Sequence, residues 1–224
     1  MMPGPLVPHL ALCMEDLMTY GFLDIAMTPS VKAAQAANGV GDQWSDFHGR
    51  RAFDHFTDNE RAFIAARDSF YMATVSQTGW PYIQHRGGPP GFLKVLDEHT
   101  LGFADFRGNR QYISVGNLAA DSRAALILVD YPRRARMKLY GHVTMTELSD
   151  NPELVERLMM PGYRARPERA MLFKLEAFDW NCPQHITPRF TEAELIPMMA
   201  PVRDRIAALE EENKMLREKL AAGG

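Results

Sequence analysis

Short strand-like segments joined by brief turns run through the middle of the chain, and this pattern constrains the fold more than any other feature. Residues 69–76 and 80–86 are rich in aromatic and β-branched side chains and flank a turn at 77–79, which predicts a β-hairpin. Further segments of the same character are residues 92–96, 100–104, 123–130, 134–147 and 170–179. Because few crossover helices fit between them, we expect an antiparallel barrel in a mainly β, α+β fold.

The helices that the sequence predicts within this region are short. Thr57 precedes Glu60 by three residues, the spacing of a capping box, which predicts a helix that continues to about Arg67. Residues 109–120 are expected to be helical, and Asn151 followed by Pro152 predicts the start of another helix. We therefore expect the barrel to carry flanking helices.

The N-terminal segment, residues 1–26, is rather apolar and has no Lys or Arg. Glu15 and Asp16 interrupt it, which argues against a secretory signal, and no transmembrane length is reached. We expect a poorly ordered extension, or sequence upstream of a true start at Met27. A membrane-contacting amphipathic helix is the alternative, but the lack of cationic residues argues against it. Residues 27–58 are expected to form a helical arm.

A heptad pattern marks the C-terminal segment, residues 191–224. Apolar residues and one asparagine recur in steps of four and three, with Val202, Leu209 and Leu216 at d and Ile206, Asn213 and Leu220 at a. This predicts an amphipathic or coiled-coil helix, and a buried Asn at an a position is a way of fixing a parallel two-stranded register. The alternative is a helix packed on its own domain. The preceding residues hold two prolines and few cations, which excludes a DNA-binding basic zipper.

Composition and missing motifs exclude several classes of function. The 224 residues carry a net charge of −3, so a fold-wide basic surface for nucleic acid is not expected. The two cysteines, Cys13 and Cys182, form no CxxC pair, which favours a reducing cytoplasm. The sequence contains no phosphate-binding GxxxxGK[ST] loop, no GxGxxG after a strand, no HExxH and no GxSxG, so we expect no metal site and no serine nucleophile.

Polar residues gather in three places along the strand region. Residues 84–91 place an arginine beside a run of glycines and prolines, and residues 105–111 place two arginines at an expected helix start. Arg134, Arg136 and Lys138 alternate on one face of an expected strand. A plain surface turn or a solvated charged loop would explain each cluster alone. Together they predict a phosphate-bearing ligand bound on the barrel.

The run of residues 67–143 resembles the pyridoxamine 5′-phosphate oxidase-like, FMN-binding split-barrel family, and the likeness extends over roughly residues 59–188. The motifs occur in the same order: a hairpin, an arginine-bearing strand, a strand ending in FADF, an arginine-rich helix start and the run NLAADSRAAL. The trailing WNCPQHITPRF is similar to the end of one branch of the family. The resemblance implies an antiparallel split barrel over residues 59–190 and a homodimer with FMN at the interface.

The resemblance also implies a set of cofactor contacts. Gln84, His85, Arg86 and Gly87 would lie along the flavin and ribityl chain, with Lys94 on the next strand. Ala104 and Asp105 would meet the flavin ring, and Asn109, Arg110 and Gln111 would form the phosphate-binding turn. Arg136 would reach the cofactor from its strand, and Trp180, Gln184 and His185 would close the site.

The activity that the resemblance implies is that of an FMN-dependent oxidoreductase acting on a small molecule, with no nucleic-acid or membrane partner. No catalytic residue is assigned; His85 and His185 are the candidates. Oxidases that make pyridoxal phosphate carry arginines around a histidine after a C-terminal tryptophan. Trp180 is followed instead by NCPQHITPRF, so that substrate motif is missing. The alternatives are a non-catalytic flavin- or haem-binding sensor, a deazaflavin in place of FMN, and an interaction protein organised by its coil.

Overall fold

The computed structural model describes residues 20–41, 43, 54–181 and 183–222. These residues fall into two compact units. The larger unit lies within residues 1–130 and 135–184, and the smaller lies within residues 131–134 and 185–224. The larger unit contains a sheet with its flanking helices, and the smaller unit contains one long helix.

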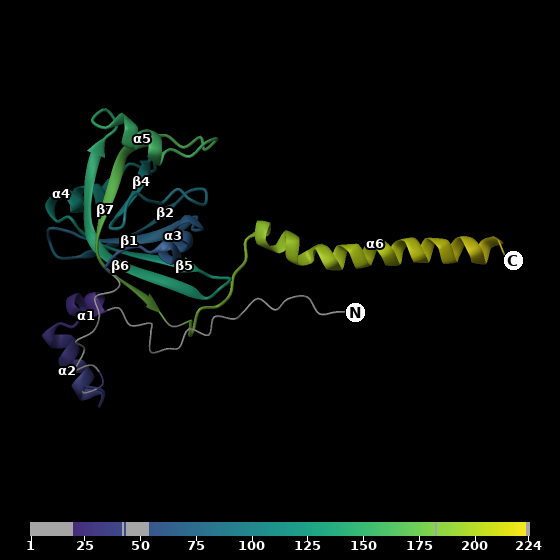
Figure 1. Cartoon of the computed structure of the whole chain (residues 1–224), viewed down its shortest axis with the longest axis horizontal. Coiled ribbons are helices and arrows are strands. Elements are labelled where there is room, and N and C mark those ends of the chain that lie inside the picture. The colour runs from purple at the N-terminus through teal and green to yellow at the C-terminus, as the bar shows by residue number, and fades with distance from the viewer. Residues whose placement is uncertain (1–19, 42, 44–53, 182, 223–224) are drawn as a thin grey trace. The chain divides into compact units, whose positions relative to one another are not determined.

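The larger unit is built on a seven-stranded sheet with the order β2-β1-β5-β6-β7-β4-β3. Every pairing between neighbouring strands is antiparallel. The fold is therefore mainly β, as the sequence predicts (Figure 1). The strands are β1 (Ser69–Val75), β2 (Pro81–Gly87), β3 (Lys94–Val95), β4 (Thr100–Phe106), β5 (Arg123–Asp130), β6 (Ala135–Glu147) and β7 (Pro167–Asn181).

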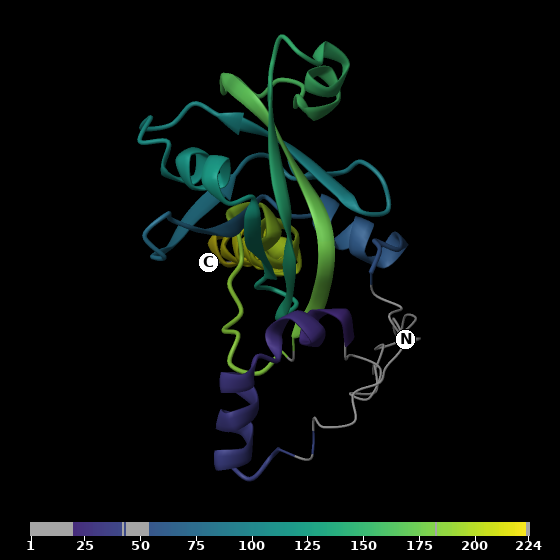
Figure 2. The ribbon, with the colours of Figure 1, turned by 90° about the vertical axis from the view of Figure 1, so that its left-hand side faces the viewer.

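The two longest strands, β6 and β7, run side by side through the middle of the sheet (Figure 2). Their register shifts between Tyr140 and Gly141, and the chains approach closely at this point. A Cβ atom on Gly141 would lie 2.2 Å from the backbone oxygen of Lys174. Only glycine fits this irregularity without a shift of the backbone.

The sheet curls until its two ends meet. Arg86 on the edge strand β2 forms an ion pair with Asp105 on β4. Four strands lie between β2 and β4 in the order of the sheet, and the two are not neighbours in any backbone pairing. The seam between them is bridged by side chains and not by a backbone ladder, which is the arrangement expected of a split barrel. The interior is filled by a core of large apolar side chains, including Phe56, Phe70, Phe103, Phe173 and Phe178.

Short helices flank the sheet, as expected. They are α1 (Tyr20–Ala26), α2 (Pro29–Ala37), α3 (Asp58–Ala65), α4 (Ile113–Ala120) and α5 (Pro152–Leu158). The capping box that starts α3 is present, with the Thr57 and Glu60 side chains each bonded to the other residue's backbone. The expected start of α4 at residue 109 is wrong, because the backbone at Arg110 and Tyr112 is left-handed and cannot continue a helix.

Part of the N-terminal segment is structured. Helix α1 packs at one end of the barrel, where the Phe22 ring stacks on Tyr140 at 4.4 Å between centroids and is 6 % exposed. The Lys138 ammonium lies over the same ring. The expectation of a poorly ordered extension is therefore wrong for residues 20–26, because an apolar side chain anchors them; residues 1–19 lie outside the described part of the chain. In the expected arm, α2 is helical and has no buried residue.

The smaller unit consists mainly of α6 (Glu192–Ala222), a helix of 31 residues. Pro197 and Pro201 lie inside its first turns, and none of its residues is buried. The heptad residues therefore face solvent in this chain. None of the described helices is both long and apolar enough to cross a bilayer.

Candidate functional site

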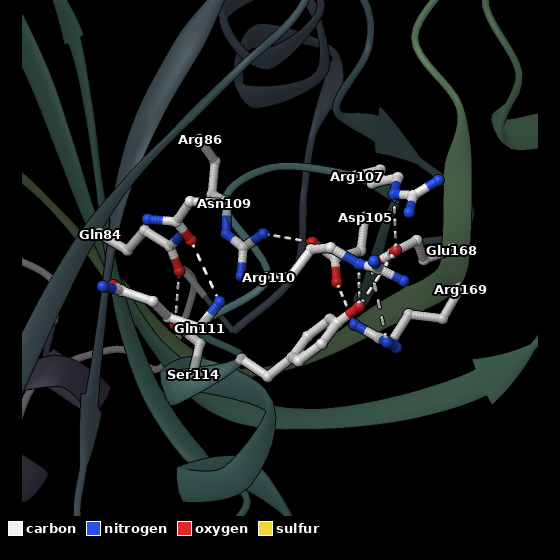
Figure 3. Close-up of polar contacts among 11 residues, drawn as sticks. Gln84, Arg86, Asp105, Arg107, Asn109, Arg110, Gln111, Ser114, Glu168 and Arg169 are labelled. Carbon is white, nitrogen blue, oxygen red and sulfur yellow. Dashed lines mark hydrogen bonds and ion pairs between the residues drawn. The ribbon is translucent and has the colours of Figure 1, made fainter.

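A cavity of about 240 Å³ lies beside the seam of the barrel, between β2, the end of β4 and the loop that leads into α4. Its wall includes six of the residues named from the sequence, which are Gln84, Arg86, Asp105, Asn109, Arg110 and Gln111. Figure 3 shows their side chains gathered around one space.

Strand β2 supplies one wall of the cavity through its two-residue alternation. Tyr82, Gln84 and Arg86 occupy one face of the strand and line the cavity. The Ser114 hydroxyl at the start of α4 donates a hydrogen bond to Oε1 of Gln84 at 2.8 Å, which ties the helix to the strand. His85 points to the opposite face, where its ring lies 5.4 Å from that of Tyr71.

Asp105 joins the two sides of the seam. Its carboxylate accepts hydrogen bonds from Nη1 of Arg86 and, at 2.6 Å, from Nη1 of Arg169 on β7. The Asp105 residue is 5 % exposed, so its charge is stable in this position only because both guanidinium groups pair with it. Two cations share this carboxylate, and Arg169 also lies 3.9 Å from a carboxylate oxygen of Glu168.

The guanidinium of Arg86 is not fully satisfied by this pairing. Its Nε is buried and has no hydrogen-bond partner among the described residues. A buried donor without an acceptor costs about 1–3 kcal/mol, so such a group indicates a place where a ligand or water supplies the acceptor. Nε of Arg136 on β6 is also buried without a hydrogen-bond partner among the described residues, but Arg136 does not line this cavity.

The loop between β4 and α4 is held in an uncommon backbone conformation. Arg110 has φ 63° and Tyr112 has φ 52°, both in the left-handed region that non-glycine residues adopt at some cost. The Tyr112 hydroxyl fixes the loop, because it donates to Oε1 of Glu168 at 3.1 Å and accepts from Nε of Arg110 at 3.4 Å. The hydrogen bond to Tyr112 also raises the pKa of Arg110.

Helix α4 begins at this loop without a side-chain cap. Tyr112 occupies the N-cap position and its side chain accepts no bond from the first turn. Ile113, Ser114 and Val115, the first residues of the helix, line the cavity. Uncapped N–H groups at a helix start, together with the helix dipole, favour a bound anion.

The charges of this network favour an anion of more than one negative charge. Arg107 pairs with Glu168 at 3.8 Å, and Asp105 pairs with Arg86 and Arg169. Arg169 also lies 3.9 Å from Glu168, so with Arg110 the network counts four guanidinium groups and two carboxylates. Of the four arginines, Arg86 and Arg110 line the cavity itself. A phosphate monoester carries close to two negative charges at neutral pH.

Other residues named from the sequence serve the fold in the described structure. Ala104 is buried in a small apolar cluster, and Lys94 pairs with Gly102 in the ladder between β3 and β4. Nε1 of Trp180 donates to Oε1 of Glu60 at 2.9 Å, and the Trp180 ring packs edge-on against Phe63. These three residues do not line the cavity.

The glycine-rich loop after β2 lies against the core rather than the cavity. Gly87 pairs with Ser69, and a Cβ atom on Gly88 would lie 2.7 Å from the ring of Phe92. Here glycine allows a close approach to a buried aromatic ring. Gln184 and His185, after β7, are exposed, and neither His185 nor His85 lines the cavity. Their suggested chemical roles stay predictions.

Several residues that the structure brings to the site belong to no motif that would single them out. Tyr82 could have been found from the alternation of β2, since it shares a face with Gln84 and Arg86. Tyr112, Glu168 and Arg169 carry no motif and meet only through the pairing of β4 with β7. Within the described ranges, no group of three or more His, Cys, Asp or Glu residues could hold a metal ion.

Solved structures give only weak likenesses. A putative pyridoxamine 5′-phosphate oxidase from Lactobacillus delbrueckii is 17% identical, covers 57% of this chain and 95% of its own, and has a TM-score of 0.44. An FMN-binding protein from Syntrophomonas wolfei is 15% identical, covers 66% of this chain and 97% of its own, and has a TM-score of 0.44. The HupZ protein of Group A Streptococcus is 14% identical, covers 60% of this chain and 99% of its own, and has a TM-score of 0.43. These values are too low to assign an activity.

A family comparison is more specific. No curated protein was found to match the chain. The family model of pyridoxamine 5′-phosphate oxidase matches residues 56–179, which is more than half of the chain and contains the sheet and the cavity. The chain therefore belongs to the pyridoxamine 5′-phosphate oxidase family.

Proposed function

We propose that this protein binds FMN in the cavity beside the barrel seam and uses it in a redox reaction on a small molecule. The observation that carries the proposal is the charge network around that cavity, in which four guanidinium groups meet two carboxylates beside the uncapped start of α4. Arg86 and Arg110 are the two cations of this network that line the cavity. Membership of the family supports a flavin as the occupant.

The residues present fit the phosphate end of FMN. Arg110 and the first N–H groups of α4 would hold the phosphate, each through a charge-assisted hydrogen bond. Gln84 and Arg86 would lie beside the ribityl chain, and the unpartnered Nε of Arg86 offers it a donor. Asp105 would keep Arg86 in place without meeting the phosphate itself.

The size of the cavity supports a homodimer. Sites for ligands of this class measure about 300–1,000 Å³ and enclose most of the ligand. The cavity of one chain, at about 240 Å³, is smaller than this range and opens at the protein surface. We therefore expect a second copy of the barrel to cover the flavin ring.

When bound, the flavin would supply the hydride or electron transfer itself, so the chain needs no nucleophile. The chain's own residues bind the phosphate, orient the cofactor through Gln84 and Arg86, and exclude water along the apolar part of the wall. The cytoplasm is the proposed location, on the ground of the two isolated cysteines.

A spectrum of the purified protein tests this proposal. We expect a yellow protein with flavin absorbance, and release of a ligand with the mass of FMN on denaturation. A colourless protein that takes up no added FMN would contradict the proposal. A released deazaflavin or haem would correct the cofactor, and bound FMN that no reductant or acceptor turns over would make the protein a binding module.

A further inference from the structure

Helix α6 presents an apolar stripe that nothing in the described chain covers. The a and d residues Val202, Ile206, Leu209, Leu216 and Leu220 are all more than 40 % exposed, and Leu220 reaches 77 %. The stripe begins after Pro201, the last proline in the helix, and continues almost to its end. Most helical stability in proteins comes from packing of an apolar face, so an exposed stripe of this kind needs a partner.

We propose that this stripe pairs with the same stripe of a second copy of the chain, in a parallel, in-register two-stranded coiled coil over Val202–Leu220. The proposal is independent of the flavin, and two features of the helix identify the partner.

The first feature is Asn213, the polar residue within the stripe. In a parallel, in-register pair, a residues face a residues, so Asn213 meets Asn213 of the second copy and each side chain finds a hydrogen-bonding partner. In an antiparallel pair with the same overlap, a residues face d residues. Asn213 would then lie against Leu209 of the second copy and lose that partner.

The second feature is the charge pattern beside the stripe. Residues Arg205 and Glu212 occupy g positions, and Glu210 and Arg217 occupy the e positions that follow them. A parallel, in-register pair places g beside the next e of the other helix. Arg205 then faces Glu210 of the second copy, and Glu212 faces Arg217, so both pairs attract.

The reverse orientation gives the opposite result. An antiparallel pair with the same overlap places e beside e and g beside g. Glu210 would face Glu210, Arg203 would face Arg217, and Arg205 would face Lys219, so each pair repels. The charges therefore select a parallel partner with this sequence, which is a second copy of the chain.

The orientation is tested by a cysteine at the end of the stripe in the full chain. In a background with Cys13→Ser and Cys182→Ser, Leu220→Cys places a thiol at an a position. A parallel pair brings the two thiols together, whereas an antiparallel pair separates them by about 27 Å along the helix. The matched control is Glu218→Cys, an outward f position two residues away.

The measurement is the fraction of disulfide-linked dimer in a glutathione redox buffer, read on a non-reducing gel. We expect at least about tenfold more linked dimer for Leu220→Cys than for Glu218→Cys, since only the first pair meets disulfide geometry. Equal fractions would overturn the proposal, whether α6 is antiparallel, alone or packed on its own barrel.

Partner choice is tested by charge exchange in the Leu220→Cys background. One variant carries Glu210→Arg and Glu212→Arg, and the other carries Arg205→Glu and Arg217→Glu. Each repels its own copy at every g–e pair, but the two attract each other. After co-expression, we expect mixed linked dimers to exceed either self-linked dimer by about tenfold. A statistical 1:2:1 ratio would overturn the charge argument. Neither readout depends on FMN.

Discussion

Asp105 is the most deeply buried carboxylate of the candidate site and has two cationic partners. It joins β2 to β7 across the seam through Arg86 and Arg169, whose side chains are only 12% and 14% exposed. Removal of this carboxylate leaves Arg86 without its ion-pair partner and Arg169 with only the longer ion pair to Glu168, at 3.9 Å. The same residue therefore supports both the closure of the barrel and the geometry of the cavity.

We expect Asp105→Ala to lower the free energy of unfolding by about 3–5 kcal/mol, the usual cost of removing one partner from a buried ion pair. Urea denaturation followed by circular dichroism measures it. The control is Asp121→Ala, which removes an exposed ion pair with Arg123 and is expected to change little. Equal losses for the two variants would show that Asp105 has no special structural role.

Asp121 allows a separate test of the surface electrostatics. Its hydrogen bonds with the Arg123 guanidinium lower its pKa from 3.8 to about 2. Because the folded pKa is below the unfolded one, the contribution to stability is present above pH 3.8 and is lost as the pH falls towards 2. An NMR titration of the carboxyl carbon should give the low pKa, and Arg123→Ala should return it towards 3.8. A titration unchanged by Arg123→Ala would contradict this cause.

At the scale of elements, strands were predictable because each carries a local period. β5 alternates buried and less buried side chains along its length, and this alternation predicts a strand from the sequence alone. The turn between β1 and β2 likewise predicts that these two strands pair as a hairpin. β7 was expected over residues 170–179 but runs from Pro167 to Asn181. Its extra length depends on pairing with β6, which no local pattern reveals.

The helix starts show where local reasoning fails. The capping box at Thr57 is a contact within four residues and was predictable. The late start of α4 depends on Tyr112, whose hydroxyl is held by Glu168 from a distant strand. Trp180 likewise packs on α3 through Glu60, a partner 120 residues earlier in the chain. The position of a side chain could not be predicted from the sequence where its hydrogen-bonding partner is distant in the chain.

The close approach of β6 and β7 predicts a strong effect at Gly141. A methyl group there would meet the Lys174 oxygen at 2.2 Å, so we expect Gly141→Ala to destabilise the protein by about 1–3 kcal/mol or more. The melting temperature measures this loss. Gly116→Ala in α4 is the matched control, because nothing lies within 4 Å of its added methyl group. A neutral Gly141→Ala would mean that the two strands are not this close.

At the scale of the whole molecule, the chain would associate through two elements, the barrel and α6. We expect a chain without residues 199–224 to remain dimeric, although more weakly, because the proposed barrel interface would be the main contact and would cover the flavin. Light scattering over a range of concentrations measures the change. A monomeric truncated chain would show that the coil alone holds the dimer, and would contradict the proposed shared cofactor site.

The family resemblance named six of the fourteen residues that line the cavity. The phosphate-side residues from β2 and the loop before α4 meet in one cavity, because they are close both in sequence and in the barrel. Lys94, Ala104, Arg136 and Trp180 do not line it.

The central claim is that Arg110 and the first N–H groups of α4 hold the phosphate of FMN. Fluorescence titration of the apoprotein with FMN and with riboflavin, which lacks the phosphate, tests it most directly. We expect the full chain to bind FMN at least about tenfold more tightly, since charge-assisted bonds to the phosphate are lost with riboflavin. Arg110→Ala should remove most of this preference, and Arg164→Ala, an exposed arginine outside the cavity, should retain it. Equal affinities for FMN and riboflavin in the unchanged protein would contradict the claim.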